Sequence, residues 1–322
     1  MNAANVARCA DALIRETGKI MIGRDDQIRL MLMAILAEGH VLLEDLPGSG
    51  KTTLAKTLSL ALGCDYSRIQ FTPDLLPSDV VGMKIYNQKT GEFQFLQGPV
   101  QTNILLADEI NRAIPRTQAA LLEAMEEKQV TVEGETTPLP APFVVMATQN
   151  PVEGESTFPL PVAQMDRFFV RLSLGYLSAQ EEMDMLSRLG DGIPFEKIEK
   201  VTSPEELQQL QKEVQEVFVS DDVKEYIVAL TQATRTHKLL RYGVSPRAAR
   251  SLFKGGKAFA AMAGRDFVTP DDIQTIAPAI LTHRISLQSE ALFSGTTPEQ
   301  VVADILAEIP VPPAKEDMFH VR

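Results

Sequence analysis

The sequence predicts an α/β domain with a mainly parallel sheet, followed by a helical domain. Short apolar runs alternate with amphipathic helical patterns over roughly the first half of the chain, as in strands that are joined through crossover helices. A glycine-rich segment directly follows the first of these runs. Beyond about residue 176 the apolar runs give way to successive helical patterns that begin at polar residues, which indicates a separate helical part.

The composition is that of a folded protein with a negative net charge. Of 322 residues, 44% are hydrophobic, and 31 basic against 43 acidic residues give a formal charge of −12. This balance disfavours a broad cationic surface for duplex nucleic acid. The sequence shows neither an apolar run of bilayer length nor a secretory signal. Cys9 and Cys64 are too few for a disulfide framework or a multi-cysteine metal site, so we expect reduced thiols in a cytoplasmic protein.

The elements of the first domain, residues 1–175, follow in order along the chain. Two helical patterns precede a short apolar strand at 41–44, which leads into a tight loop. Helices between successive strands are what a parallel sheet requires. Further strands are predicted at 104–107, 143–147 and 168–172, and helices at 53–62 and 115–128.

Two segments interrupt this alternation of strands and helices. Residues 83–97 have a turn at Gly91 between two alternating runs, and residues 129–142 have a turn at Gly134 followed by three prolines. Both patterns are typical of β-hairpins. We therefore expect two hairpin inserts in the first domain.

The second part is predicted to be helical over residues 176–310. Ser203-Pro-Glu-Glu and Thr269-Pro-Asp-Asp each combine an N-cap residue, a proline at the first helical position and acids in the first turn. The last residues, 311–322, are predicted to form an irregular tail. Helical patterns cover 178–189, 203–217, 220–236, 245–263 and 269–277.

A phosphate-binding loop is the strongest functional signal. It lies between the strand at 41–44 and the helix at 53–62, where backbone N–H groups and the positive end of a helix can wrap phosphates. Lys51 supplies a cation for phosphate oxygens, and Thr52 a hydroxyl ligand for Mg²⁺. The general pattern begins with glycine where this chain has Asp45, which affects only the mouth of the loop. The predicted ATP-binding residues are Pro47, Gly48, Ser49, Gly50, Lys51, Thr52 and Thr53.

Two acidic residues follow the strand at 104–107. Asp108 can complete the Mg²⁺ shell together with Thr52, and Glu109 can polarise an attacking water. The strand at 143–147 leads to Asn150, whose amide could contact the γ-phosphate, although an Asn-Pro pair alone is usually a turn signal. The combination predicts nucleotide hydrolysis.

Longer segments extend the pattern beyond these residues. They are Gln70–Asp79, Ala107–Ala113, Leu121–Glu127, Ala147–Pro151, Met165–Phe168 and Gly243–Arg247. With the phosphate loop, they resemble the AAA+ ATPases, and more closely the MoxR family in the helix-2-insert group. The resemblance runs from about residue 22 to about residue 283. It implies a P-loop AAA+ αβα core with a parallel sheet, followed by an all-helical lid domain.

The resemblance also implies roles for three residues. Asn150 would be the sensor-1 residue. Arg167 would be the arginine finger, which reaches the γ-phosphate of a neighbouring subunit in a ring, and fixed arginines are well suited to stabilise charge on a phosphoryl group. Arg247 would be the sensor-2 arginine, carried by the lid over the bound nucleotide. From the residues alone, Arg112 and Arg116 could each be an interfacial arginine or pair within the domain, and the sequence does not separate these alternatives.

The predicted function is Mg²⁺-dependent ATP hydrolysis by a ring, expected to be a hexamer, that remodels or activates protein clients. The resemblance implies clients with a von Willebrand factor A domain, tasks such as cofactor or metal insertion, and hairpins that point towards the ring pore or a substrate. A nucleic-acid motor is disfavoured by the net charge and by Glu92, Glu133 and Glu135 in the hairpins. A small-molecule kinase has little need for two hairpins and a large lid. A nucleotide-gated scaffold with little turnover is a further alternative.

Overall fold

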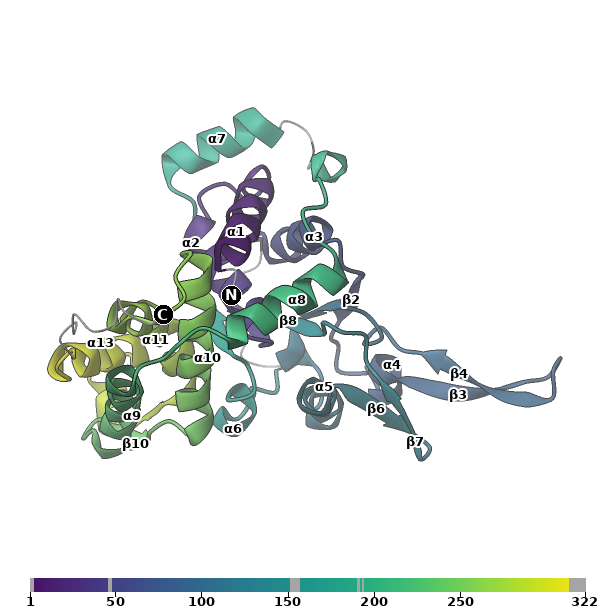
Figure 1. Ribbon diagram of the computed structural model, residues 1–322. Coiled ribbons are helices and arrows are strands. Elements are labelled where there is room, and N and C mark those ends of the chain that lie inside the picture. Colours follow the sequence, from purple (N-terminus) through teal and green to yellow (C-terminus); the bar gives the residue numbers. More distant parts are fainter. Residues whose placement is uncertain (1–2, 46–47, 151–156, 190–191, 193, 313–322) are drawn as a thin grey trace.

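A five-stranded parallel sheet lies near the centre of the molecule (Figure 1). The computed structural model describes residues 3–45, 48–150, 157–189, 192 and 194–312. The sheet has the order β2-β5-β8-β1-β9, and each neighbouring pair is parallel. The predicted parallel α/β core is therefore confirmed. The strands are β1 (Val41–Glu44), β2 (Tyr66–Gln70), β5 (Ile104–Asp108), β8 (Val144–Gln149) and β9 (Val170–Leu172).

Strand β2 is absent from the prediction based on sequence. It lies at an edge of the sheet, where it pairs with β5. Ile69 is its buried residue, and the others are partly or largely exposed. An edge strand of this kind lacks the continuous apolar run that identifies a strand buried on both faces.

Alternate residues of the strands belong to two hydrophobic cores, one on each face of the sheet. Leu106 of β5 packs in the core of the first face, whereas its neighbours Leu105 and Ala107 pack in the core of the second. Such two-sided coverage explains why every residue of β5 and β8 is buried. The helices are α1 (Ala3–Gly18), α2 (Asp25–Leu36) and α3 (Lys51–Leu62) on the first face, and α4 (Pro77–Val81) and α5 (Pro115–Glu127) on the second.

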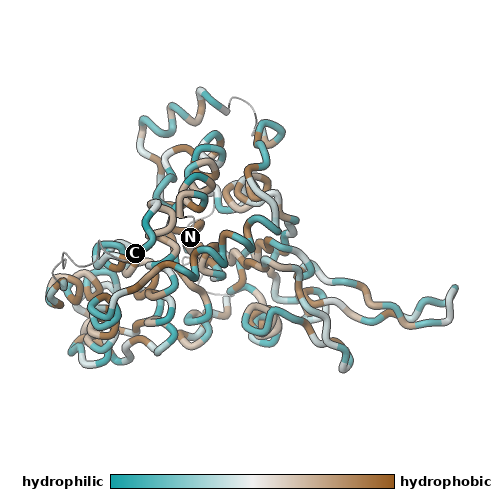
Figure 2. Tube along the Cα trace, in the orientation of Figure 1, coloured by the Kyte–Doolittle hydropathy of each residue, from teal (hydrophilic) through white to brown (hydrophobic). Residues whose placement is uncertain are grey.

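Two antiparallel hairpins extend from the sheet domain on the right of Figure 1. The first, β3 (Gly82–Asn87) and β4 (Glu92–Gln97), projects furthest, and the second consists of β6 (Gln129–Val132) and β7 (Glu135–Pro138). An ion pair of 2.5 Å between Lys84 and Glu135 joins the two hairpins. Figure 2 shows apolar stretches along the first hairpin although it stands away from the core.

The elements that follow β9 form a largely helical lid, as predicted. It also contains the short antiparallel pair β10 (Leu240–Tyr242) and β11 (Ser286–Leu287), which the sequence patterns did not indicate. Its apolar residues are continuous with those of α1, α2 and the first face of the sheet. The helices that follow β8 are α6 (Val162–Met165), α7 (Ala179–Leu189), α8 (Pro204–Gln215), α9 (Asp221–Thr236), α10 (Pro246–Met262), α11 (Pro270–Leu281), α12 (Ser289–Phe293) and α13 (Pro298–Glu308).

Polar caps determine where the lid helices begin. The side-chain oxygens of Ser203, Ser220, Ser245 and Thr269 each accept a backbone N–H of the first helical turn. Each such cap stabilises its helix by about 1 kcal/mol. Within the ranges given above, no helix has both the length and the apolar character that crossing a lipid bilayer would need.

Candidate nucleotide site

The phosphate loop has a backbone that favours glycine at two positions. Gly48 and Gly50 have φ angles of 82° and 91°, in the left-handed region that side chains with a Cβ rarely adopt. Helix α3 begins at Lys51, so its first N–H groups and the positive end of its dipole face the loop. The Ser49 hydroxyl is buried and has no hydrogen-bond partner in the described structure. These features fit a bound triphosphate. Pro47 lies outside the described residues.

Asp45, which departs from the usual pattern, ties the loop to the chain that follows β9. Its carboxylate accepts the Ser173 hydroxyl at 2.7 Å and the backbone N–H groups of Leu174 and Gly175 at 2.5 and 3.1 Å. An aspartate can make these bonds and a glycine cannot, since glycine has no side-chain acceptor. The departure therefore has a structural role at the mouth of the loop.

Lys51 lies between the loop and the acids that follow β5. Its ammonium group donates to the backbone oxygen of Asp45 at 2.7 Å. Burial lowers the pKa of Lys51, and the negative charges of Asp45, Asp108 and Glu109 act against this shift. The structure thus places the predicted phosphate ligand, Lys51, close enough to both predicted acids for their charges to act on it.

The hydroxyl of Thr148 contacts both Asp108 and Glu109 at the end of β5. It donates to Oδ1 of Asp108 at 2.6 Å and accepts the backbone N–H of Glu109 at 2.8 Å. Glu109 has a φ of 55°, so the chain turns sharply at this residue. Asn150 follows β8, the strand that carries Thr148, and is buried at the same edge of the sheet.

Both acids already have basic or amide partners from other elements. Arg68 of β2 pairs with Oδ2 of Asp108 at 2.6 Å. Oε2 of Glu109 accepts the Gln70 amide at 2.6 Å and pairs with Arg112 at 3.0 Å. Neither Arg68 nor Gln70 was predicted as a site residue, because β2 was not predicted. The signal that could have identified them is their alternate spacing in a short polar strand that ends at the same edge as β5.

The donor set fits Mg²⁺ only together with phosphate oxygens. Thr52 is the second residue of α3, and Asp108 is the predicted carboxylate ligand. In the described ranges no group of three or more His, Cys, Asp or Glu is arranged to hold a metal by itself. Mg²⁺ is usually held by one or two carboxylates plus substrate phosphates and waters, so these residues would suit it once a nucleotide is bound.

A cavity of about 370 Å³ opens beside the phosphate loop, and the sequence analysis did not predict it. Arg24 helps to form it by donating to the backbone oxygen of Gly175 at 3.0 Å. Apolar walls next to a phosphate site are suited to a flat aromatic base. Its lining includes Ile20, Met21, Ile22, Gly48, Gly50, Thr53, Tyr176, Leu177 and Met185.

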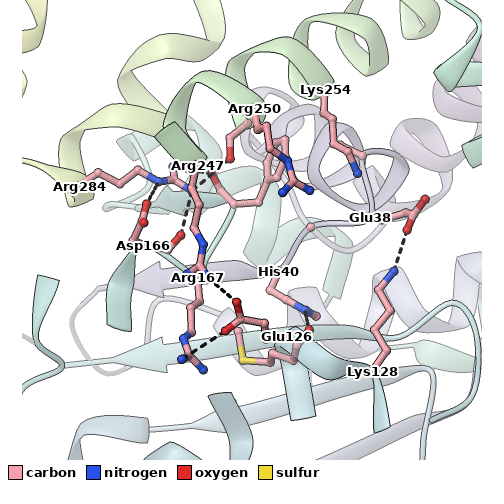
Figure 3. A pocket seen from close by; sticks show the side chains of 15 residues that line it. Glu38, His40, Glu126, Lys128, Asp166, Arg167, Arg247, Arg250, Lys254 and Arg284 are labelled. Carbon is pink, nitrogen blue, oxygen red and sulfur yellow. Dashed lines mark hydrogen bonds and ion pairs between the residues drawn. The ribbon is translucent and has the colours of Figure 1, made fainter. Parts of the chain in front are cut away.

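Arg167 and Arg247 meet in a different hollow, of about 440 Å³ (Figure 3). Arg167 donates to the backbone oxygen of Leu122 at 2.8 Å and pairs with Oε2 of Glu126 at 3.2 Å. Arg247 pairs with Oε1 of the same carboxylate. The other predicted candidates lie elsewhere: Arg112 pairs with Glu109 of its own chain, and Arg116 is exposed in the first turn of α5.

The two arginines and the phosphate loop lie at opposite ends of the strands. Strands β1 and β9 are parallel, with Val41 opposite Val170. The loop follows β1, whereas Arg167 precedes β9. Leu174, which follows β9, lies beside the loop through its bond to Asp45, so the length of β9 separates the loop from Arg167.

Arg247 therefore does not lie over the phosphate loop of its own chain, contrary to the position that the resemblance implied. The reason is the packing of α10, which contacts α1, α2 and α11. This packing directs the first turn of α10 towards Glu126, at the amino ends of the strands.

Comparisons with known proteins agree with this architecture. Residues 40–170 match the model of the ATPase family associated with various cellular activities (AAA), and residues 232–305 match the AAA lid domain. The chain is 41% identical to Chaperone MoxR1 of Mycobacterium tuberculosis over 93% of this chain and 81% of that protein. The chain belongs to the MoxR family of AAA+ ATPases.

Further MoxR-family and structural relatives extend the match. The chain is 52% identical to the uncharacterized protein YeaC of Bacillus subtilis, with 93% of each chain covered. Protein MoxR of Methylorubrum extorquens is 31% identical, with 85% of this chain and 86% of that protein covered. A solved structure of a protein from Cytophaga hutchinsonii, provisionally described as an ATPase, superposes with a TM-score of 0.90 at 40% identity, covering 97% of each chain.

Proposed function

We propose that the protein hydrolyses Mg²⁺-ATP in a homo-oligomeric ring and uses the hydrolysis to remodel or activate a protein client. The observation that carries this proposal is the separation of the site into two halves. The phosphate loop, Asp108 and Glu109 lie at the carboxyl ends of the strands, and Arg167 and Arg247 at the amino ends. Head-to-tail contacts between copies bring such halves together and close into a ring. A hexamer is the ring size that the family implies.

Within one subunit, the loop residues up to Thr53 would hold the triphosphate through backbone N–H groups, with Lys51 as the cation. Thr52 and Asp108 would hold Mg²⁺, which neutralises phosphate charge when it is bound. The cavity beside the loop would take the adenine base. Each of these roles uses residues that already lie at one edge of the sheet.

Glu109 would accept the proton of the attacking water, and Asn150 would help to orient that water. The contacts of Glu109 with Gln70 and with Arg112 both involve Oε2 of its carboxylate. Arg167 and Arg247 of the adjacent subunit would then stabilise charge on the γ-phosphate. The complete site would thus have one half from each of two chains.

The hairpins support a protein client over a nucleic acid. Tyr86 and Phe93 form an exposed cross-strand pair near the tip, with ring centroids 5.3 Å apart. Lys84 is neutralised by Glu135, which weakens any attraction of the hairpins for phosphates. The relative named Chaperone MoxR1 supports a chaperone-like task. Clients with a von Willebrand factor A domain, and cofactor or metal insertion, are the specific forms of this task that the family implies.

We also propose that the protein acts in the cytoplasm. Cys9 and Cys64 are both free thiols, as expected in a reducing compartment. Burial raises the pKa of the Cys64 thiol to about 12, so this group stays protonated and unreactive.

Mixing two inactive variants tests the shared site. Arg167→Ala protomers keep Lys51, Asp108 and Glu109 but offer no finger, whereas Glu109→Gln protomers have an inactive site and still offer Arg167. Each variant alone should bind ATP and lose about 10²-fold or more in turnover. In an equal mixture roughly one interface in four combines a subunit with intact Glu109 and a neighbour with intact Arg167, so ATPase activity should reappear.

Light scattering after size exclusion should first establish that both variants assemble and exchange subunits. If they co-assemble and the mixture stays as inactive as its components, Arg167 does not serve a neighbouring chain. An active Arg167→Ala homo-oligomer would reassign the finger role to Arg116 or Arg112. A protein that stays monomeric at all nucleotide concentrations would contradict the ring.

A further inference from the structure

Glu126 is a half-exposed acid that contacts both arginines of the hollow in Figure 3. Its Oε2 atom lies 3.2 Å from Arg167, and Oε1 pairs with Arg247. Arg167 belongs to the sheet domain and Arg247 to the first turn of the lid helix α10. One carboxylate therefore connects two guanidinium groups that come from different parts of the fold.

Both Glu126 and Arg247 occupy helix positions that are electrostatically unfavourable. Glu126 is in the last turn of α5, where the negative end of the helix dipole repels an acid, and Arg247 is in the first turn of α10, where the positive end repels a cation. Pairing relieves both costs, but pairs this exposed contribute little to stability. The arrangement is thus better explained by the placement of the arginines than by the energy of folding.

A second carboxylate, that of Asp166, connects the same two segments. Asp166 accepts the hydroxyl of Ser245, the cap of α10, at 2.7 Å, and pairs with Arg284 at 2.8 Å. Residues 166 and 167 are consequently joined to residues 245 and 247 at two points. The guanidinium groups meet at Glu126 because the backbone segments that carry them are fixed relative to each other.

We infer that Glu126 is a positioning residue that presents Arg167 and Arg247 as a pair to the γ-phosphate of the neighbouring subunit. The inference rests on the proposed shared site. Two guanidinium groups repel each other, and a carboxylate between them reduces that repulsion. Each guanidinium has five N–H donors, so donors remain for phosphate after the contact with Glu126. Preorganised charge of this kind costs no rearrangement during the reaction.

The test is Glu126→Gln, with Glu123→Gln as the matched control, because Glu123 is an exposed acid one turn earlier on α5. Glu126→Gln should lower turnover ten- to a hundredfold, the usual scale for misplaced catalytic groups. Affinity for a fluorescent ATP analogue and the thermal midpoint should stay close to those of the unmodified protein. Glu123→Gln should retain turnover. Unchanged or raised turnover in Glu126→Gln would overturn the inference.

Mixtures decide on which side of the interface Glu126 acts. Glu126→Gln protomers keep their own site, so mixing with Glu109→Gln, which offers intact arginines, should restore activity. Mixing with Arg167→Ala should not, since both members lack a competent arginine pair. The reverse pattern would place Glu126 in its own subunit's reaction and overturn the inference. If the Arg167→Ala and Glu109→Gln reference mixture is itself inactive, the shared site fails, and this inference fails with it.

Discussion

His40 is a buried residue whose two ring nitrogens are both engaged, directly before β1. Nδ1 accepts the backbone N–H of Val145 at 3.0 Å, so Nε2 carries the proton and donates to the backbone oxygen of Met125 at 3.1 Å. Burial lowers the pKa of His40 from 6.5 to about 4, against the raising effect of the Met125 carbonyl. His283 is also buried, but among the described residues only its Nε2 has a partner, the backbone oxygen of Phe168 at 3.1 Å, and burial lowers its pKa well below 6.5.

These neutral histidines predict a loss of stability in mild acid. Between about pH 6.5 and about pH 4 the unfolded chain binds a proton at position 40 that the folded chain does not, so the free energy of unfolding falls as the pH falls. Each such histidine adds a slope of up to about 1.4 kcal/mol per pH unit. Urea unfolding of the unmodified protein and of His40→Gln at several pH values measures this contribution, because glutamine does not titrate. The variant should show a smaller decrease in stability over this interval, and equal slopes would contradict the assignment.

At the residue scale, the sequence predicted the ligands of the site better than their partners. Motif spacing led to Asp108, Glu109 and Lys51, and the structure brings these together. It could not reveal Glu126 as the partner of Arg167, because that contact joins the end of α5 to a segment 41 residues later through packing alone. Pair contacts of this type depend on tertiary geometry and leave no local pattern.

The β3–β4 hairpin exposes large apolar side chains on a projecting strand pair. Tyr86 is 56% exposed and Phe93 is 68% exposed, and Ile85 and Leu96 are also exposed. Apolar side chains on a projecting strand pair mark contact sites more often than structural ones.

We therefore predict that Tyr86→Ser combined with Phe93→Ser weakens client binding without loss of basal ATP hydrolysis. Replacing two large exposed rings with hydroxyls removes most of the apolar area at the tip, and an affinity loss of about tenfold or more is expected. Fluorescence anisotropy with a labelled, permanently unfolded polypeptide measures this binding. Phe293→Ser, a 92% exposed ring on α12 in the lid, is the matched control and should bind normally. Equal losses in both variants would mean that the hairpin is not a specific contact site.

At the element scale, the buried strands and the capped helices α8 to α11 were predictable, and the edge strand β2 was not. The five residues of β5 are buried, and an uninterrupted apolar run identifies such a strand. The polar starts of α8, α9, α10 and α11 likewise coincide with observed caps. Strand β2 and the pair β10–β11 are short and partly polar, so their pairing depends on neighbours far away in the sequence.

For the whole molecule, a buried ion pair joins the sheet domain and the lid in addition to their shared hydrophobic core. The Arg284 side chain is 2% exposed and pairs with Asp166 at 2.8 Å. It also donates to the backbone oxygens of Phe168 and Phe169 at 2.6 and 3.1 Å. Burial lowers the pKa of Arg284 to about 10, and the charge of Asp166 acts in the opposite direction.

Asp166→Asn should accordingly destabilise the whole protein, because Arg284 would stay charged and buried without a counter-ion. Removing one partner of a buried pair typically costs about 3–5 kcal/mol. Chemical denaturation followed by circular dichroism should show an earlier transition for lid and sheet together, since they share one hydrophobic core. Lys224→Met, which breaks the exposed pair with Asp221, should unfold almost as the unmodified protein does. A normal midpoint for Asp166→Asn would show that Arg284 finds compensation elsewhere.

The position of the lid relative to the sheet domain could not be predicted from the sequence. The helices α7 to α11 were predicted from the sequence, whereas α12 and α13 were not. The direction of α10 depends on contacts with α1, more than two hundred residues earlier. Those contacts decide that Arg247 faces Glu126 instead of the phosphate loop. Local patterns determine where a helix begins, and only packing determines where it points.

The opposite placement of the phosphate loop and of Arg167 gives each subunit two different ends, one with the phosphate loop and one with Arg167. For the proposed assembly, a lone subunit has two unmatched ends and no complete site. An open row of n subunits has n − 1 complete sites, and ring closure adds the last one. In that assembly the activity per subunit would follow the fraction of subunit interfaces that are formed, and dilution would abolish activity without any change inside a subunit.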